Sequence, residues 1–246
     1  MPTAQSLAQY PLLANAPVST SPYEMAQNMY GIIKQHYAKL PKPHVIMFVG
    51  PPASGKTSLY RNVFPDYVWV NQDTLKTLPA VLKSITAALN SGKNVVVDRT
   101  HGTVDARLKV MEVIKPRVPA VPVHVLQLDV PKELSIRMNL VRAHVSKGQG
   151  TAVPTIVFHT YYKSFEPPQE KEGFASIEKL PWYVLDPHHG SFLNSHTRHR
   201  CRSGIVFSHF TSLVLLSYAG FPTCLSGTAT TTSPSSPPHS PCLRLQ

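Results

Sequence analysis

Eight consecutive residues constrain the fold of this chain more than any other feature. They match the pattern G-x-x-x-x-G-K-[S/T] at every fixed position and read Gly50-Pro51-Pro52-Ala53-Ser54-Gly55-Lys56-Thr57. Glycines let such a turn point its backbone N–H groups inward at phosphate oxygens, and the N-terminus of a following helix adds its positive end. The pattern predicts a phosphate-binding loop between a strand and a helix. A Gly/Pro turn that contains Gly-Lys-Thr by coincidence is the alternative, which the buried apolar run at 45–49 disfavours.

Short β-branched runs alternate with helical segments on both sides of this loop. A first helix is expected from Ser21, whose spacing to Glu24 fits a capping box, to the residues before Pro41. The elements expected after the loop are helix 56–63, strand 67–70, helix 74–90, strand 95–97, helix 103–115, strand 121–128, helices 132–146 and 154–164, and edge strand 174–180. This alternation is typical of an α/β fold, with a parallel sheet covered by helices on both faces.

Composition divides the chain into three parts. Residues 1–20 lack a sustained period, which predicts a flexible N-terminal segment before a domain at 21–186. Residues 187–246 contain no acid and no lysine and end rich in Thr, Ser and Pro, so a low-complexity or disordered tail is expected. The tail histidines and Cys201 lack the paired C-x-x-C spacing of a zinc site. The apolar stretch 204–218 is too short for a membrane span, so no membrane partner is expected.

Charge and cysteine usage narrow the functional class. The formal net charge is +11, of which residues 1–186 carry +7, since they hold all 13 acids and 20 of the 24 basic residues. Such a balance suits a polyanionic partner, although it could equally serve solubility. All three cysteines lie in the tail, so no disulfide framework supports the domain. With no apolar leader at the start of the chain, an intracellular, reducing location is expected.

Two carboxylates follow predicted strands at the edge where parallel sheets bind ligands. Asp73 follows the strand at 67–70, and Asp98 ends the strand at 95–97. A kinase needs a carboxylate that accepts the proton of the attacked hydroxyl, and Asp73 is the candidate base. Thr57 and Asp98 are the candidate ligands of Mg²⁺, and Asp98 could also position substrate. The structural alternatives are a helix cap at Asp73 and a turn residue at Asp98.

Four arginines are candidate contacts for phosphate. Arg137 and Arg142 lie on a helix that could close over a nucleotide and stabilise the charge that develops during phosphoryl transfer. Their five-residue spacing places them about 140° apart around a regular helix, so at least one is expected to face solvent. Arg99 and Arg107, near the end of the strand at 95–97, are candidates for gripping a substrate phosphate, against the alternative of ordinary surface arginines.

Four stretches together resemble the kinase domain of polynucleotide kinase 3′-phosphatases, a branch of the phosphate-loop kinases. The resemblance covers about residues 42–182 through Gly50 to Ser58, Val70-Asn71-Gln72-Asp73-Thr74-Leu75, Gly92-Lys93-Asn94-Val95-Val96-Val97-Asp98-Arg99-Thr100, and Phe165-Glu166-Pro167-Pro168 followed by Glu172-Gly173-Phe174. The last stretch is informative, because a phosphate loop alone would not predict it.

The resemblance implies a phosphate-loop kinase that transfers the γ-phosphate of ATP to the 5′-hydroxyl of DNA or RNA ends, with ATP and Mg²⁺ as cofactors. Asp73 would be the base and Lys56 the phosphate contact, Asp98 would belong to the active site, and the lid helix would supply arginine. Nucleic-acid end repair, in the nucleus rather than in the cytoplasm or mitochondrion, is the setting it suggests. The expected nucleotide contacts are Gly50, Pro51, Pro52, Ala53, Ser54, Gly55, Lys56, Thr57 and Ser58.

The sequence departs from the family at three points. The family usually has Asn where Arg99 stands, and its lid arginines tend to be four residues apart. No Asp-x-Asp pattern of a phosphatase domain occurs, so 3′-phosphatase activity is not expected. Two other functions stay open. A small-molecule kinase of the same class would share Lys56 and Thr57 but need no basic groove, and a non-catalytic nucleotide-binding adaptor would have a lid that no longer assembles.

Overall fold

Five parallel strands form the sheet of this protein, in the order β2-β3-β1-β4-β5. The computed structural model describes residues 7–19, 21–117, 120–145 and 152–181. The strands are β1 (Val45–Val49), β2 (Val68–Asn71), β3 (Val95–Asp98), β4 (Val123–Asp129) and β5 (Ser176–Pro181). Because β1, β3 and β4 lie inside the sheet, their side chains are buried on both faces, which is why they read as apolar runs without alternation.

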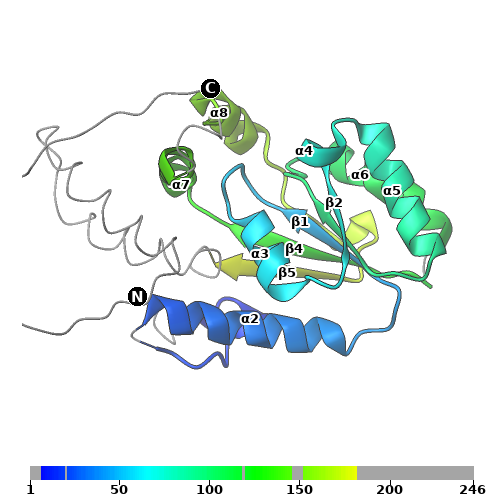
Figure 1. The fold of residues 1–246 in the computed structure, drawn as a ribbon, viewed down its shortest axis with the longest axis horizontal. Coiled ribbons are helices and arrows are strands. Elements are labelled where there is room, and N and C mark those ends of the chain that lie inside the picture. The colour runs from blue at the N-terminus through cyan, green and yellow to red at the C-terminus, as the bar shows by residue number, and fades with distance from the viewer. Residues whose placement is uncertain (1–6, 20, 118–119, 146–151, 182–246) are drawn as a thin grey trace, which may run out of the picture. The chain divides into compact units, whose positions relative to one another are not determined.

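Helices cover both faces of this sheet (Figure 1). One face packs against α2 (Pro22–Ala38) and α3 (Lys56–Val63), through side chains such as Ile46 and Phe48 of β1. The other face packs against α5 (Leu78–Asn90) and α6 (Val104–Ile114), through Val45 and Met47 of the same strand. Successive residues of a strand point to opposite faces, so β1 contributes to two separate cores. The predicted α/β class with helices on both faces is therefore confirmed.

The remaining helices lie toward the carboxyl ends of the strands. They are the short α4 (Gln72–Leu75), α7 (Lys132–Val145) and α8 (Thr155–Ser164). Three 3₁₀ turns complete the described elements: η1 (Pro11–Leu13) before α2, η2 (Lys115–Arg117) after α6, and η3 (Glu170–Glu172) between α8 and β5. The hydroxyl of Tyr162 on α8 donates to the carbonyl oxygen of Val130 at 2.6 Å, which fixes α8 to the end of β4. Figure 1 shows α4, α7 and α8 around the same edge of the sheet.

The single helix expected at 74–90 is wrong, because the chain forms α4 and α5 with a break between them. Lys76 adopts a φ of 66°, a left-handed conformation that ends α4. Thr77 then caps α5 by accepting a hydrogen bond from the backbone N–H of Ala80. The break leaves α4 as one turn at the end of β2, separate from the helix that covers the sheet.

A flexible segment at 1–20 is also wrong for the residues that the structure describes there, which begin at Leu7. The side chains of Leu7 and Leu13 are fully buried, and Tyr10 is 7% exposed. They pack with Met25 and Met29 of α2 in the core on one face of the sheet. These apolar side chains lack helical or strand spacing, so periodicity could not reveal that the domain includes them.

The predicted tail falls outside the described residues, as do its histidines, its cysteines and the apolar stretch 204–218. Among the residues that are described, no helix is both long and apolar enough to cross a membrane.

Candidate active site

The phosphate loop connects β1 to α3 and depends on unusual backbone conformations. Gly55 caps α3 with a φ of 87°, and Ala53 has a φ of 56°. At Gly50, a Cβ atom would lie 3.0 Å from both the Cβ of Leu128 and the Oγ of Ser54, so a larger residue would disturb the loop. The backbone N–H of Gly50 donates to the carbonyl oxygen of Thr100 at 3.0 Å, which holds the loop beside the end of β3.

Lys56 is buried inside this loop without a carboxylate in hydrogen-bond contact. Its amine donates to the carbonyl oxygens of Gly50 and Pro51, at 3.0 and 2.6 Å, and to the hydroxyl of Ser54 at 3.1 Å. Burial lowers the pKa of Lys56 from 10.5 to about 8; the charges of Asp98 and Asp73 act against this shift. An anion placed against this amine would stabilise its charged form, so the loop is suited to bind phosphate oxygens.

Asp98 lies at the end of β3, buried to 3% exposure, where three donors converge on one of its oxygens. Its Oδ2 accepts hydrogen bonds from the Thr57 hydroxyl at 3.0 Å, the Trp69 indole N–H at 3.1 Å and the Asn71 amide at 3.1 Å. The indole of Trp69 stacks on the ring of Tyr60, with 5.2 Å between the ring centroids. These contacts fix the orientation of the carboxylate toward the phosphate loop.

The pairing of Thr57 with Asp98 fits a magnesium ion. Mg²⁺ prefers oxygen ligands, keeps several waters and takes only one or two oxygens from the protein beside those of phosphates. A hydroxyl at the start of α3 and a carboxylate at the end of β3, hydrogen-bonded to each other, supply such oxygens next to Lys56. Thr57 and Asp98 are therefore the residues that would hold such an ion.

Asp73 lies in α4, at the carboxyl end of β2, with an exposed side chain. The helix cap here is Asn71, whose side chain accepts a hydrogen bond from the backbone N–H of Thr74 at 3.0 Å. The interpretation of Asp73 as the cap is therefore wrong. The charge of Asp73 instead raises the pKa of Lys56, so its carboxylate lies within electrostatic reach of the phosphate loop.

The two lid arginines differ in their surroundings, although both lie on α7 with exposed side chains. The charge of Arg142 lowers the pKa of Lys56, and its guanidinium donates to Asn139 at 3.1 Å. Arg137 makes no hydrogen bond or ion pair with the residues that the structure describes. Of the two, Arg142 is the one whose charge acts on Lys56.

Two sets of contacts hold α7 in place, one to the phosphate loop and one to the segment before α8. The hydroxyl of Ser135, near the start of α7, donates to the carbonyl oxygen of Pro52 at 2.8 Å. Asn139 is 3% exposed and pairs with both backbone polar groups of Val153, at 2.9 and 3.0 Å, which ties α7 to the segment before α8. The lid helix is therefore attached at its N-terminal end to the very loop it would cover.

Arg107 has a structural role, which corrects its prediction as a substrate contact. Its side chain is fully buried and makes five hydrogen bonds, one for each N–H. Two of them join Glu172 at 2.8 Å in a bidentate ion pair, and the others go to the carbonyl oxygens of His101, Glu166 and Pro167. Arg107 has no N–H left for a substrate phosphate.

The ion pair of Arg107 explains the stretch Phe165-Glu166-Pro167-Pro168 and the glutamate that follows it. Glu166 accepts from the backbone N–H of Val104 through its side chain and donates its own N–H to the carbonyl oxygen of Gly102, both at 2.8 Å. At Gly102, a Cβ atom would lie 2.7 Å from the ring of Tyr161. The stretch therefore fixes the loop between β3 and α6, which lies beside the phosphate loop.

Arg99 differs from Arg107 in lacking partners. One of its terminal nitrogens, Nη1, is buried and has no hydrogen-bond partner among the described residues, and burial lowers the pKa of Arg99. A buried N–H without an acceptor is costly, and an anionic ligand would relieve that cost. Arg99 stays a candidate for contacting substrate.

Sequence analysis did not identify Trp69, Asn71 or Ser135 as site residues. A signal existed for the first two, because residues two apart on a strand point to the same side, and Asp73 follows them closely. For Ser135 no signal existed, since its contact joins residues 83 positions apart.

Comparisons with known proteins point in the same direction as this geometry. Residues 45–168, about half of the chain, match the family model described as AAA domain. A bifunctional polynucleotide phosphatase/kinase of Schizosaccharomyces pombe is 31% identical over 153 residues, 61% of this chain and 36% of that protein. A putative bifunctional polynucleotide phosphatase/kinase of Acanthamoeba polyphaga mimivirus is 34% identical over 144 residues, 58% of this chain and 34% of that protein.

The chain thus spans about a third of the length of the curated relatives it matches. These matches confirm the resemblance stated from the sequence, over the region of the phosphate loop. Among solved structures, a fungal RNA kinase is similar with a TM-score of 0.43 and 12% identity, over 74% of this chain and 100% of that chain.

Proposed function

We propose that this chain, which belongs to the AAA domain family, is a kinase that transfers the γ-phosphate of ATP to the 5′-hydroxyl of a DNA or RNA strand. One observation carries the proposal. Lys56, buried in the phosphate loop, is influenced by the charges of Asp73 and Arg142, which come from α4 and α7. A phosphate-binding amine, a candidate base and a candidate charge-stabilising arginine thus meet at one edge of the sheet. The names of the two curated relatives support a nucleic acid as the acceptor.

In the proposed reaction, the 5′-oxygen of the acceptor attacks the γ-phosphorus of ATP and its proton passes to the carboxylate of Asp73. The bond between the γ-phosphorus and the β–γ bridging oxygen breaks, so ADP leaves and a 5′-phosphate remains on the strand. Asp73 is exposed in α4, so an acceptor can reach it from solvent. Asn71, two residues before Asp73, caps α4 and thereby fixes the start of the helix that carries this carboxylate.

The other residues orient the phosphates and balance their charge. The N–H groups of the loop and the Lys56 amine would contact the β- and γ-phosphates. Bound at Thr57 and Asp98, Mg²⁺ would neutralise charge on the same phosphates. Arg142, whose charge reaches Lys56, would be the lid arginine that contacts them, and Arg99 would contact a phosphate of the acceptor, which would satisfy its buried N–H.

Incubation with γ-labelled ATP, Mg²⁺ and a 5′-hydroxyl oligonucleotide tests the proposal. We expect label on the strand, and none on a control strand of the same sequence that already carries a 5′-phosphate. Asp73→Asn should lower the rate by about 10²- to 10⁴-fold, because the base is lost. Glu112→Gln removes an exposed carboxylate from α6 and should leave the rate unchanged.

Two results would reject this function in favour of the alternatives. No label on any oligonucleotide, with transfer to small alcohols intact, would indicate a small-molecule kinase. A trace of transfer that Asp73→Asn does not diminish would indicate a nucleotide-binding adaptor.

We also propose that the chain acts in the nucleus, in the repair of nucleic-acid ends. The +7 charge of residues 1–186 supports a polyanionic partner there. Fluorescence microscopy of the tagged full chain tests the location, and a purely cytoplasmic signal would contradict it.

A further inference from the structure

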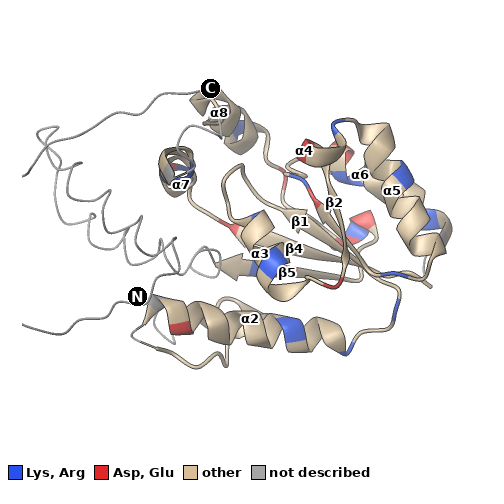
Figure 2. Cartoon of the chain, viewed as in Figure 1, with Lys and Arg blue, Asp and Glu red and all other residues tan. Residues whose placement is uncertain are grey.

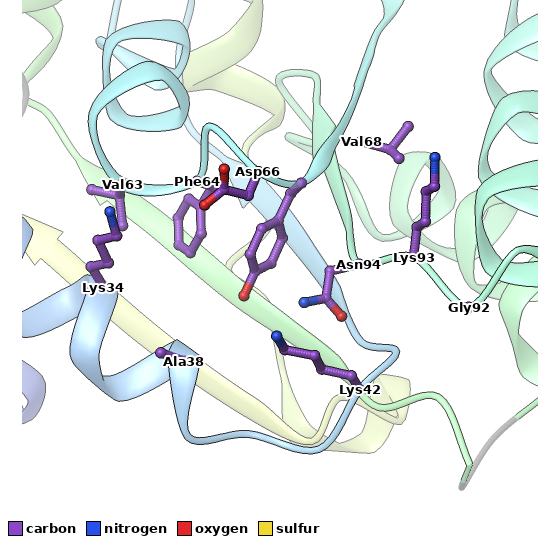
Figure 3. Close-up of a pocket in the computed structure, with 11 residues that line it drawn as sticks. Lys34, Ala38, Lys42, Val63, Phe64, Asp66, Val68, Gly92, Lys93 and Asn94 are labelled. Atoms are coloured by element: carbon purple, nitrogen blue, oxygen red, sulfur yellow. The ribbon is translucent and has the colours of Figure 1, made fainter.

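A pocket of about 440 Å³ lies at the edge of the sheet opposite the phosphate loop (Figure 3). It is lined by residues that precede or begin strands, among them Lys42, Asn94 and Val68, and by residues near the ends of α2 and α3. Because the strands are parallel, this is the edge of their amino ends, whereas Lys56, Asp73 and Asp98 lie at or beyond carboxyl ends. The pocket is therefore separate from the candidate active site.

Three lysines from three parts of the fold line this pocket. Lys34 comes from α2, Lys42 from the segment before β1, and Lys93 from the turn before β3. In the view of Figure 3, Lys34 and Lys93 lie on opposite sides, with Lys42 and Asn94 between them. Asp66 is the one acid among the lining residues. All three lysines have exposed side chains, and neither ion pair of the described chain includes them.

The surrounding sequence increases this positive charge. Between Glu24 and Asp66 the chain contains no acid, while it contains five basic residues, Lys34, Lys39, Lys42, Lys56 and Arg61. Figure 2 shows lysine on α2 and along the loop that follows it. A hollow surrounded by charge of one sign concentrates ions of the opposite sign. The pocket is thus suited to an anion.

Two polar residues that line the pocket, Tyr67 and Asn94, are paired with His44, which lies behind the lining. His44 is buried and holds the carbonyl oxygen of Pro41 at 2.8 Å through Nδ1, which must therefore donate, and its Nε2 accepts from the Tyr67 hydroxyl at 2.9 Å. Burial lowers the pKa of His44, which keeps the ring uncharged. The side-chain oxygen Oδ1 of Asn94 accepts from the backbone N–H of His44 at 3.1 Å. The amines of the three lysines make no ion pair with the described residues and are thus available to a negatively charged ligand.

We propose that this basic pocket, defined by Lys34, Lys42 and Lys93, binds a backbone phosphate of the nucleic acid strand whose 5′ end is phosphorylated. The inference rests on the proposed function for its choice of ligand. Lysine ammonium groups bind phosphate as point charges, and α3, which contains no acid, runs from the phosphate loop at Lys56 to the pocket at Val63.

The distance between the two sites sets the length of strand that can reach both. Helix α3 begins at Lys56 in the phosphate loop and ends at Val63, which lines the pocket. Seven steps of 1.5 Å along a helix give about 10 Å between these ends. At about 3.4 Å of rise per nucleotide, at least about three nucleotides are needed to cover that distance. A dinucleotide acceptor is therefore too short to occupy both sites, and a 15-mer is long enough.

Fluorescence anisotropy with 3′-labelled DNA, a dinucleotide and a 15-mer, tests the proposal. The variant Lys34→Gln/Lys42→Gln/Lys93→Gln should bind the 15-mer about tenfold more weakly than the wild type. The slope of log affinity against log salt should fall by about 0.7, since that is the contribution of one phosphate contact on a single strand. Binding of the dinucleotide should not change.

The matched control is Lys83→Gln/Lys115→Gln/Lys179→Gln, which removes the same charge at exposed positions outside the pocket. It should weaken 15-mer binding less than twofold. Equal losses in the two triple variants would overturn the proposal, because net charge alone would then explain the effect. An equal loss for the dinucleotide would overturn it too, since the lysines would then act at the strand end. Thermal unfolding of both variants should match the wild type.

Two further measurements identify the source of the phosphate and separate this inference from the proposed function. If the pocket variant loses affinity for a fluorescent ATP analogue but not for the 15-mer, the pocket binds nucleotide and the proposal is overturned. If the wild type binds the 15-mer through these lysines yet transfers no label, the proposed function fails and the pocket inference stands. If label transfer is intact but both triple variants bind the 15-mer like the wild type, the pocket inference alone fails.

Discussion

Of the lysines and arginines that the structure describes, two are buried, Lys56 in the phosphate loop and Arg107 in α6, and their partners differ in kind. The amine of Lys56 donates only to two carbonyl oxygens and one hydroxyl, all neutral. The guanidinium of Arg107 forms a bidentate ion pair with Glu172, and every remaining N–H meets a carbonyl oxygen. One buried cation thus lacks a directly bonded anion, and the other has one.

This difference separates a binding group from a structural group. A buried charge that is paired and fully hydrogen-bonded has nothing to gain from a ligand. A buried charge held by neutral acceptors retains a cost of desolvation that an incoming anion relieves, and the lowered pKa of Lys56 reflects that cost. The sequence pattern identified Lys56 for this role, whereas Arg107 looked like a phosphate contact until its partners were known.

Lys56→Met should have the largest effect on function and a small one on stability. Phosphate transfer should fall by about 10²- to 10³-fold, because a charge that stabilises the transition state is lost. The melting temperature should not fall, since a neutral side chain of similar length avoids the cost of burying the amine. Rates with labelled ATP and thermal unfolding measure the two effects. A large drop in melting temperature would show that Lys56, like Arg107, stabilises the fold, and would contradict the proposed difference between them.

Arg107→Met should show the opposite pattern, with a loss of stability of about 3–5 kcal/mol, because Glu172 would be left buried and unpaired. Urea unfolding measures this loss. Lys109→Met provides the control, as it breaks an exposed ion pair with Asp105 and should cost less than about 1 kcal/mol. Equal costs for the two variants would show that Arg107 does not brace the fold.

Arg142→Gln should lower the rate of transfer by about tenfold, because this arginine, whose charge reaches Lys56, is the one proposed to stabilise charge on the transferred phosphate. Arg137→Gln on the same helix is the matched control and should change the rate by less than about threefold. The comparison uses kcat at saturating ATP. If Arg137→Gln has the larger effect, α7 must rotate when the site is loaded, and the arrangement described for the lid does not apply to the reacting state.

The protonation state of Lys56 should also be measurable from the pH dependence of ATP binding, although this effect is smaller. At about pH 9, above the lowered pKa of about 8, ATP binding should take up close to one proton, because the phosphates favour the charged amine. Calorimetry in buffers of different ionisation enthalpy measures this uptake. Lys56→Met should abolish it, and an equal uptake by that variant would assign the proton to another group.

The lowered pKa of Lys56 also predicts the direction in which the stability of the nucleotide-free protein changes with pH. The folded-state pKa of Lys56 lies below its unfolded value of 10.5, so the cost of the buried charge is fully present below about pH 8. Between about pH 8 and 10.5 the unfolded chain binds more protons, and the contribution of Lys56 to stability should rise with pH. The difference in unfolding free energy between the wild type and Lys56→Met measures it.

Local sequence predicted most elements of the fold but not where the chain departs from regular geometry. The strands and helices around the loop follow from apolar runs and spacing, because a parallel sheet buries both faces of its strands. The break at Lys76 and the packing of Leu7 and Leu13 onto α2 could not be predicted this way. Both depend on contacts with distant residues, which a local pattern does not contain.

The sequence by itself determined the phosphate loop and the carboxylates that follow the strands, because the geometry of a Gly-rich turn and the alternation of strand and helix segments are local properties. Only the tertiary structure decided which cations are available to a ligand. Arg107 and Glu172 are 65 positions apart, and Thr57 and Asp98 are 41 apart. Whether a buried charge is neutralised depends on what the folded chain places against it, and no spacing along the sequence contains that information.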